Sequence, residues 1–127
     1  MQESRSYEYA VIRVVPKVER EEFFNAGVIL YCPSEKFLRM RWQLDEKCLR
    51  MFCDKIDLAE LQQNLKAFES ICHADEDSGP IGKLPIPERF RWLTATRSTI
   101  LQTSRVHPGL CKDASEMLDH LFTQLVL

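Results

Sequence analysis

The segment YEYAVIRVV at residues 7–15 constrains the fold of this chain more than any other stretch. It is rich in β-branched and aromatic residues, which are enriched in strands. Successive side chains alternate between two faces, and both faces carry apolar residues, so the pattern predicts a central strand of a sheet. Pro16 follows directly and predicts the end of this strand, because proline has no backbone N–H to donate to a neighbour.

Two more strands are predicted nearby, at residues 26–32 (AGVILYC) and 37–42 (FLRMRW). The residues between them, PSEK, have the length and composition of a hairpin connection. Before the first of these strands, VEREEFF at residues 18–24 predicts a short charged turn of helix. The three strands therefore predict an antiparallel arrangement in the first third of the chain.

The basic third of the chain is predicted to be partly extended. RSTILQTSRVH at residues 97–107 fits a fourth extended segment that Pro108 and Gly109 close. ERFRWLTAT at residues 88–96 fits either a helical turn or a strand with its arginines outward. DEDSGPIGKLPIP at residues 75–87 has the acids, glycines and prolines of an exposed loop.

Two amphipathic helices are predicted, one over residues 57–74 and one beginning at Asp113. In each, an aspartate precedes a glutamate by three positions, the spacing of a capping box, and apolar residues recur every three or four positions. A stripe of Leu44, Cys48, Met51 and Phe52 predicts a short helix before them. The chain is therefore expected to form one α+β domain over residues 1–127, with an antiparallel sheet of about four or five strands and two main helices packed on it.

Composition favours a soluble domain in a reducing compartment. The chain has 127 residues, of which 45% are hydrophobic and 28% charged, as in ordinary globular domains. No segment approaches the roughly eighteen apolar residues of a membrane span, and the N-terminus lacks the apolar core of a signal peptide. The five cysteines show no CxxC spacing, so reduced thiols in the cytoplasm are expected rather than disulfides.

Charge is segregated along the chain although the net charge is only −2. Residues 54–78 hold seven acids and two lysines, whereas residues 82–112 hold six bases and one acid. The basic block contains LTATRSTILQTSRVHPGL at residues 93–110, which combines six hydroxyl side chains with two arginines. Guanidinium groups bind carboxylates and phosphates, and neighbouring hydroxyls complete such sites. The predicted binding residues are Arg97, Ser98, Thr99 and Arg105, assisted by Arg89 and Arg91.

Each candidate also has a plain structural interpretation. The basic segment alternates like a half-exposed edge strand, which is the favoured interpretation of its hydroxyls. Asn25 could present its amide to a ligand, but Asn25 and Gly27 are also the residue types that reach positive φ at a turn into a strand, which is favoured.

Three other function classes have partial support in the sequence. Phe90 and Trp92 lie among arginines as in nucleic-acid binders, but a sequence pI near 5.9 argues against that class. An enzyme or phosphate-binding protein would use Arg97, Ser98 and Arg105, with Glu22 as base. A zinc site would need His107 and Cys111 with Cys48 and Cys53 as a second pair, and no metal or cofactor is predicted. The motifs GxxxxGK[ST], GxGxxG, HExxH and GxSxG do not occur.

Two stretches together resemble a known family. AVIRVVPKVEREEFFNAGVILYCP and LTATRSTILQTSRVHPGL, with the capped final helix, are similar to the bacterial domain of unknown function numbered thirty thirty-seven. Glu22, Phe23, Asn25, Gly27 and Val28 match its Glu-Phe-x-Asn-x-Gly-Val element. The resemblance covers nearly the whole chain and implies no reaction or catalytic residue. Because genes of that family often neighbour genes for kinase-like proteins similar to HipA, it implies such a protein as a partner.

The function expected from these observations is a non-catalytic cytoplasmic binding module that docks a protein partner through the basic segment. Arg97 and Arg105, assisted by Arg89 and Arg91, would engage acidic or phosphorylated groups on that partner, because charge complementarity sets register and association rate.

Overall fold

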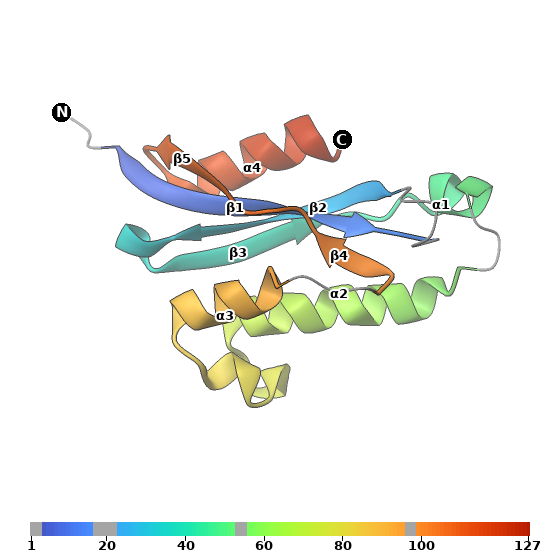
Figure 1. Cartoon of the computed structure of the whole chain (residues 1–127), viewed down its shortest axis with the longest axis horizontal. Helices are drawn as coiled ribbons and strands as arrows, with labels where there is room; N and C mark the ends of the chain where they lie inside the picture. Colours follow the sequence, from blue (N-terminus) through green and yellow to red (C-terminus); the bar gives the residue numbers. More distant parts are fainter. Residues whose placement is uncertain (1–3, 17–22, 53–55, 96–98) are drawn as a thin grey trace.

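A computed structural model describes residues 4–16, 23–52, 56–95 and 99–127, and these form a five-stranded antiparallel sheet with helices on both faces (Figure 1). The sheet order is β3-β2-β1-β4, and β5 also pairs with β1. The strands are β1 (Arg5–Val14), β2 (Phe24–Cys32), β3 (Phe37–Trp42), β4 (Leu101–Thr103) and β5 (His107–Cys111). The helices are α1 (Glu46–Phe52), α2 (Leu58–His73), α3 (Ile86–Leu93) and α4 (Ala114–Leu125). The predicted α+β class is confirmed.

The central position of β1 is confirmed, because it pairs with β2 on one side and with β4 and β5 on the other. The hairpin between β2 and β3 is also confirmed. Its connection is the short 3₁₀ helix η2 (Pro33–Glu35), after which Lys36 adopts a left-handed φ of 50°. The predicted helical turn at residues 18–24 lies mostly outside the described residues, and Phe24 already belongs to β2.

Helices cover the sheet from opposite sides. In Figure 1, α4 lies on one face, and α2 and α3 lie on the other. One apolar core lies between the sheet and α2, with Ile12, Ile29, Met40 and Leu65 among its residues. A second core, under α4, contains Val28, Leu30, Cys32 and Leu118, among others. Because both faces of β2 are covered, every residue from Ala26 to Cys32 is buried, which explains the uninterrupted apolar run in the sequence.

Both predicted capping spacings mark true helix starts. The Asp57 carboxylate accepts a hydrogen bond from the backbone N–H of Glu60 at 3.0 Å, and Asp113 accepts one from Glu116 at 3.0 Å. Each aspartate therefore satisfies a backbone donor that the helix itself leaves free.

Replacing Asp113 by Ala is expected to lower the free energy of unfolding by about 1 kcal/mol, because the first turn of α4 loses its cap. Urea denaturation of the variant measures this loss. Gln124→Ala on the exposed side of the same helix is the control and should stay within about 0.5 kcal/mol of the parent. Equal stability of the two variants would contradict the capping role.

Three local predictions are wrong in detail. Among the α1 side chains whose burial the structure describes, Leu49 is the buried one, while Met51, placed on the apolar stripe, is 86% exposed. Residues 75–87 are not a plain loop, since they contain the 3₁₀ helices η3 (Glu76–Ser78) and η4 (Ile81–Lys83). The fourth extended segment does not end at Pro108 and Gly109, which lie inside β5. Proline is tolerated there because β5 is an edge strand.

Candidate functional site

The basic segment is split between two short strands that both pair with β1. Between β4 and β5, Ser104 replaces part of the missing ladder: its backbone N–H donates to the Val11 carbonyl, and its Oγ accepts from the Val11 N–H, both at 2.8 Å. Arg105 follows directly and is exposed. These two hydrogen bonds hold the backbone next to Arg105 against β1, while the arginine side chain lies in solvent.

Of the other predicted residues in this segment, Arg97 and Ser98 lie outside the described residues. Thr99 is exposed, and its Oγ1 donates to the Leu101 carbonyl at 2.8 Å, while Gln102 Nε2 donates to the Thr99 carbonyl. The Thr99 hydroxyl is thus engaged in a local turn just before β4.

Of the two interpretations of residues 88–96, the helical turn is correct and the strand with outward arginines is wrong. Residues 86–93 form α3, not a strand, and Arg89 is only 7% exposed. Its Nη1 donates to the carbonyls of Ile71 and Cys72 at 2.9 and 3.1 Å, at the end of α2. The guanidinium gives a donor to the Cys72 carbonyl and a second donor to the Ile71 carbonyl, which also accepts from the Ala74 N–H at the helix end. Its positive charge interacts favourably with the negative end of the helix dipole. Arg89 therefore has a structural contact that competes with the proposed binding role.

Arg91 is exposed on α3, next to Trp92, which is 38% exposed and packs edge-on against Phe68. The end of α3 lies against β4, because the Thr103 Oγ1 donates to the Thr94 carbonyl at 3.3 Å. This contact joins the helix that carries Arg91 to the sheet edge that carries Arg105.

Asn25 and Gly27 do not form a turn with positive φ; both lie within β2. The register of β1 and β2 shifts so that Ile12 pairs with Gly27 and Arg13 with Asn25, which leaves Ala26 as the extra residue of a bulge. Asn25 Nδ2 donates to the Leu125 carbonyl at 2.9 Å and so ties β2 to the end of α4. The favoured turn interpretation is therefore wrong, and the amide has a structural partner.

Asn25 also lies at the edge of a pocket of about 270 Å³. Its lining comes from β1, β2, α1, the segment before α1 and the end of the chain, and it includes Val14, Phe24, Leu44, Asp45 and Cys48. Of the predicted binding residues that the structure describes, Arg89, Arg91, Thr99 and Arg105 are not part of this lining. The pocket that the enzyme alternative requires, joining the N-terminal turn to the basic segment, is therefore not the one around Asn25. Glu22, its proposed base, lies outside the described residues.

The residues considered for zinc do not come together. Cys48 is exposed on α1 and hydrogen bonds to Asp45 at 3.4 Å, an interaction that raises the pKa of the thiol. His107 packs against the Tyr9 ring with centroids 5.3 Å apart. Cys53 lies outside the described residues. Cys72 is a core thiol of α2, and burial raises its pKa to about 12.

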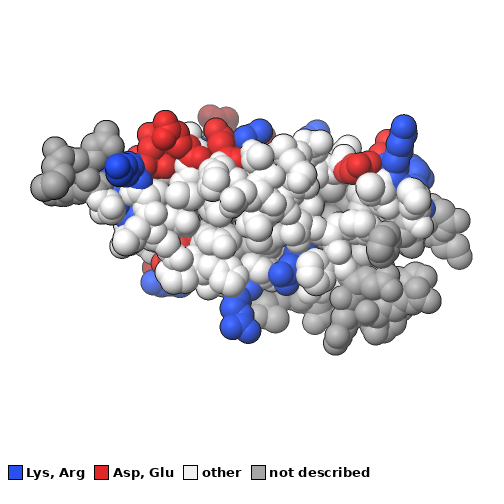
Figure 2. Space-filling view, turned by 90° about the horizontal axis from the view of Figure 1, so that it is seen from above, with Lys and Arg blue, Asp and Glu red and all other residues white. Residues whose placement is uncertain are grey.

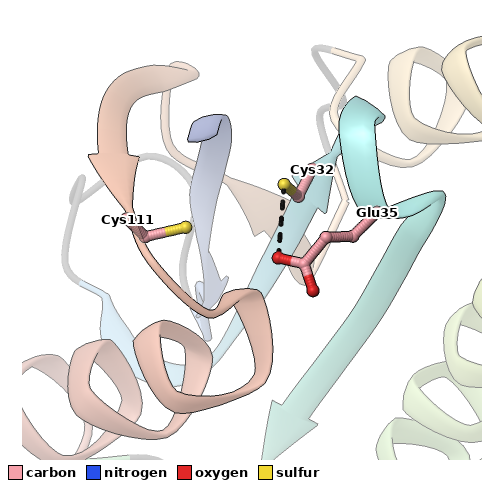
Figure 3. Close-up of side chains that lie close together, drawn as sticks. All are labelled: Cys32, Glu35 and Cys111. Atoms are coloured by element: carbon pink, nitrogen blue, oxygen red, sulfur yellow. Dashed lines mark hydrogen bonds between the residues drawn. The ribbon is translucent and has the colours of Figure 1, made fainter. Parts of the chain in front are cut away.

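A different group of metal-ligating side chains does come together: Cys32, Glu35 and Cys111 (Figure 3). One ligand atom from each lies within 4.8 Å of the other two. The Cys32 thiol donates to Glu35 Oε2 at 3.8 Å, and this oxygen also accepts from the Ala114 N–H at 3.0 Å. Burial raises the pKa of Cys111, and the nearby Cys32 and Glu35 raise it further. The sequence pattern does not reveal this group, because only Cys32 and Glu35 are close together in the chain.

On the face that α4 covers, charged side chains stand mainly along the border, and the middle consists largely of uncharged residues (Figure 2). The Lys and Arg side chains that this view shows are separated from one another. A continuous basic surface, which a nucleic-acid backbone requires, is therefore not found among the described residues of this face. None of the helices in the described ranges is long and apolar enough to cross a membrane.

Comparison with known proteins gives one match. A family model described as "Protein of unknown function (DUF3037)" matches residues 9–126, and so covers nearly the whole chain. Neither a curated protein nor a solved structure matches the chain significantly. The matched range includes all five strands, apart from the first residues of β1, and all four helices.

Proposed function

Because this chain belongs to the DUF3037 family of proteins of unknown function, we propose a function from its surface chemistry: it is a non-catalytic module that docks an anionic site on a protein partner. The docking residues are Arg91 and Arg105, together with Arg97 from the adjoining segment. The anionic site is a cluster of acidic side chains or a phosphorylated residue, since both match the guanidinium group.

The proposal rests on which exposed arginines have an acidic partner within this chain. Three of them pair with acids of this chain: Arg5 with Glu35, Arg41 with Asp119 and Arg50 with Glu46. Among the described residues, no acid lies within ion-pair distance of Arg91 or Arg105. These two guanidinium groups therefore keep their donors for a ligand from outside.

The fold also supports this use of the two arginines. Ser104 holds the interrupted edge to β1 on the N-terminal side of Arg105, and the bond between Thr103 and Thr94 connects the edge to the end of α3. Trp92, partly exposed beside Arg91, adds an aromatic surface of the kind enriched in protein interfaces. Rigid elements on both sides reduce the conformational entropy that binding would cost.

The proposal includes a bacterial cytoplasmic location and a kinase-like protein similar to HipA as the first partner to test. The first part agrees with the four described cysteines, which are all free thiols. The second part comes from the gene neighbourhood that the family resemblance implies, and it supplies a protein whose phosphorylated residues would suit arginine.

Reversing both charges, in Arg91→Glu with Arg105→Glu, is expected to reduce association with the partner roughly tenfold or more, because attraction becomes repulsion. Tagged parent and variant proteins are used to capture partners from the native host with and without nuclease, and any candidate is then purified and titrated. Arg50→Glu is the matched control, since Arg50 is an exposed arginine on α1 and already pairs with Glu46.

A protein that binds the parent and the Arg50→Glu control, survives nuclease and is lost with the double variant supports the proposal. Binding that is unchanged in the double variant rules out these two arginines. Capture that disappears with nuclease shifts the function to nucleic acid, and a phosphorylated small molecule that copurifies with the chain favours the phosphate-binding alternative.

A further inference from the structure

We propose that Cys32, Glu35 and Cys111 form a binding site for one zinc ion, at the end of the sheet where α4 begins. This inference is independent of the docking function. It rests on three side chains with metal-ligating atoms that three separate elements bring within 4.8 Å of one another (Figure 3).

The backbone holds all three residues in place. Cys32 is the last residue of β2, and Glu35 ends the 3₁₀ helix that follows it. Cys111 is the last residue of β5 and lies opposite Arg5 on the central strand β1. In Figure 3 the Cys32 and Glu35 side chains approach each other, and the Cys111 sulfur is directed toward them. Because both cysteines end hydrogen-bonded strands, forming the site requires little loss of backbone freedom.

The ligand set selects zinc among the common divalent ions. Thiolates favour zinc over calcium and magnesium, which prefer oxygen ligands. Zinc–sulfur bonds of about 2.3 Å and zinc–oxygen bonds of about 2.0–2.2 Å place ligand atoms roughly 3.5–3.8 Å apart in a tetrahedron. The observed separations, within 4.8 Å, reach this range through small side-chain rotations. Three protein ligands leave the fourth position for water.

The surroundings compensate the charge of such a centre. Two thiolates and a carboxylate around a divalent ion carry one net negative charge. The Arg5 guanidinium lies 3.8 Å from Glu35 Oε2, and the Ala114 N–H at the start of α4 donates to the same oxygen. A positive side chain and the positive end of a helix dipole therefore face the site. The Glu35 side chain is 27% exposed, which gives the ion a path from solvent, while both sulfurs are buried.

A purely structural role explains only part of this arrangement. Glu35 alone, through Ala114 and Arg5, is enough to join the hairpin turn to α4 and β1. That role needs no second thiol beside the carboxylate. The convergence of Cys111 on Cys32 and Glu35 is what the metal site accounts for.

The test uses the full reduced chain, freed of metal with a chelator, and Co²⁺ as a spectroscopic probe before Zn²⁺ competition. One equivalent of Co²⁺ is expected to produce the near-ultraviolet absorption of cobalt–thiolate bonds and the visible bands of a tetrahedral ion, and Zn²⁺ should displace it. Cys32→Ser and Cys111→Ser should each remove the signal of their thiolate. Glu35→Gln should weaken binding by more than tenfold, and Arg5→Ala by about tenfold, the size of a typical outer-shell effect.

Cys48→Ser is the matched control, because Cys48 is an exposed thiol outside the cluster, and it should leave the spectrum and the affinity unchanged. Circular dichroism checks that each variant is folded. If either buried cysteine variant fails to fold, Glu35→Gln decides: Zn²⁺ should raise the melting temperature of the parent more than that of this variant. Absence of cobalt–thiolate absorption in the parent, its loss with Cys48→Ser, or equal zinc stabilisation of parent and Glu35→Gln would overturn the proposal.

Discussion

Replacing Arg89 by Ala is expected to lower the free energy of unfolding by about 3 kcal/mol. The guanidinium is buried and donates to the last carbonyls of α2, Ile71 and Cys72. A hydrogen bond from a charged group contributes about 1.5–3 kcal/mol. Its removal takes this donor from both carbonyls, of which Ile71 keeps the Ala74 N–H at 3.2 Å. Chemical denaturation followed by circular dichroism measures the loss.

Two further variants separate the charge from the packing of the side chain. Arg89→Met keeps most of the apolar stem, so a similar loss in this variant assigns the effect to the hydrogen bonds. Arg91→Ala, two positions along the same helix, removes an exposed arginine and should change stability by less than about 0.5 kcal/mol. If Arg89→Ala were as stable as Arg91→Ala, the structural role of Arg89 would be wrong.

Replacing Gly27 by Ala is expected to cost about 2–3 kcal/mol, near the upper end of the range for overpacking a core. A Cβ at this position would lie 2.5 Å from the carbonyl oxygen of Arg41 and 2.9 Å from the Cβ of Trp42. The oxygen belongs to the backbone of β3, so the strand itself must move to relieve the contact. The paired strands would separate next to the β1–β2 bulge.

The control for this effect is Gly109→Ala in the edge strand β5. There the added Cβ would lie within 2.7 Å of ring atoms of Tyr7, which belong to the end of a side chain that can turn, whereas at Gly27 it meets the backbone of β3. Thermal and urea unfolding should therefore rank Gly27→Ala as the less stable variant. An equal or reversed order would show that β3 tolerates the added methyl group.

The role of Gly27 shows how a residue type can be recognised for the wrong reason. Glycine and asparagine beside a strand favoured a turn with positive φ, yet both residues lie in β2. A side chain at Gly27 is excluded because β3, the neighbouring strand, lies too close to this position of β2. That strand is ten residues or more away in the chain, so no local pattern around Gly27 reports its approach.

The candidate site residues also fall into two groups: those recognised from the local sequence and those that only the fold brings into position. Arg91 and Arg105 were recognised from the basic block, and their exposure agrees with the sequence-based expectation. Arg89 has the same local appearance as Arg91, but residues 86–93 form a helix that turns Arg89 toward the end of α2. The thiol cluster was missed because Cys111 meets Cys32 only after β5 pairs with β1.

The sequence by itself determined the features that depend on neighbours in the chain: the strand of alternating apolar residues at β1, the hairpin at PSEK, and the aspartate caps of α2 and α4. These features arise from side-chain periodicity, turn chemistry and hydrogen bonds spanning a few residues. Only the tertiary structure decided which arginine is buried, why position 27 must be glycine and which cysteines meet. Each of these depends on the packing of distant segments, and a distance between segments is not encoded in the local pattern of either one.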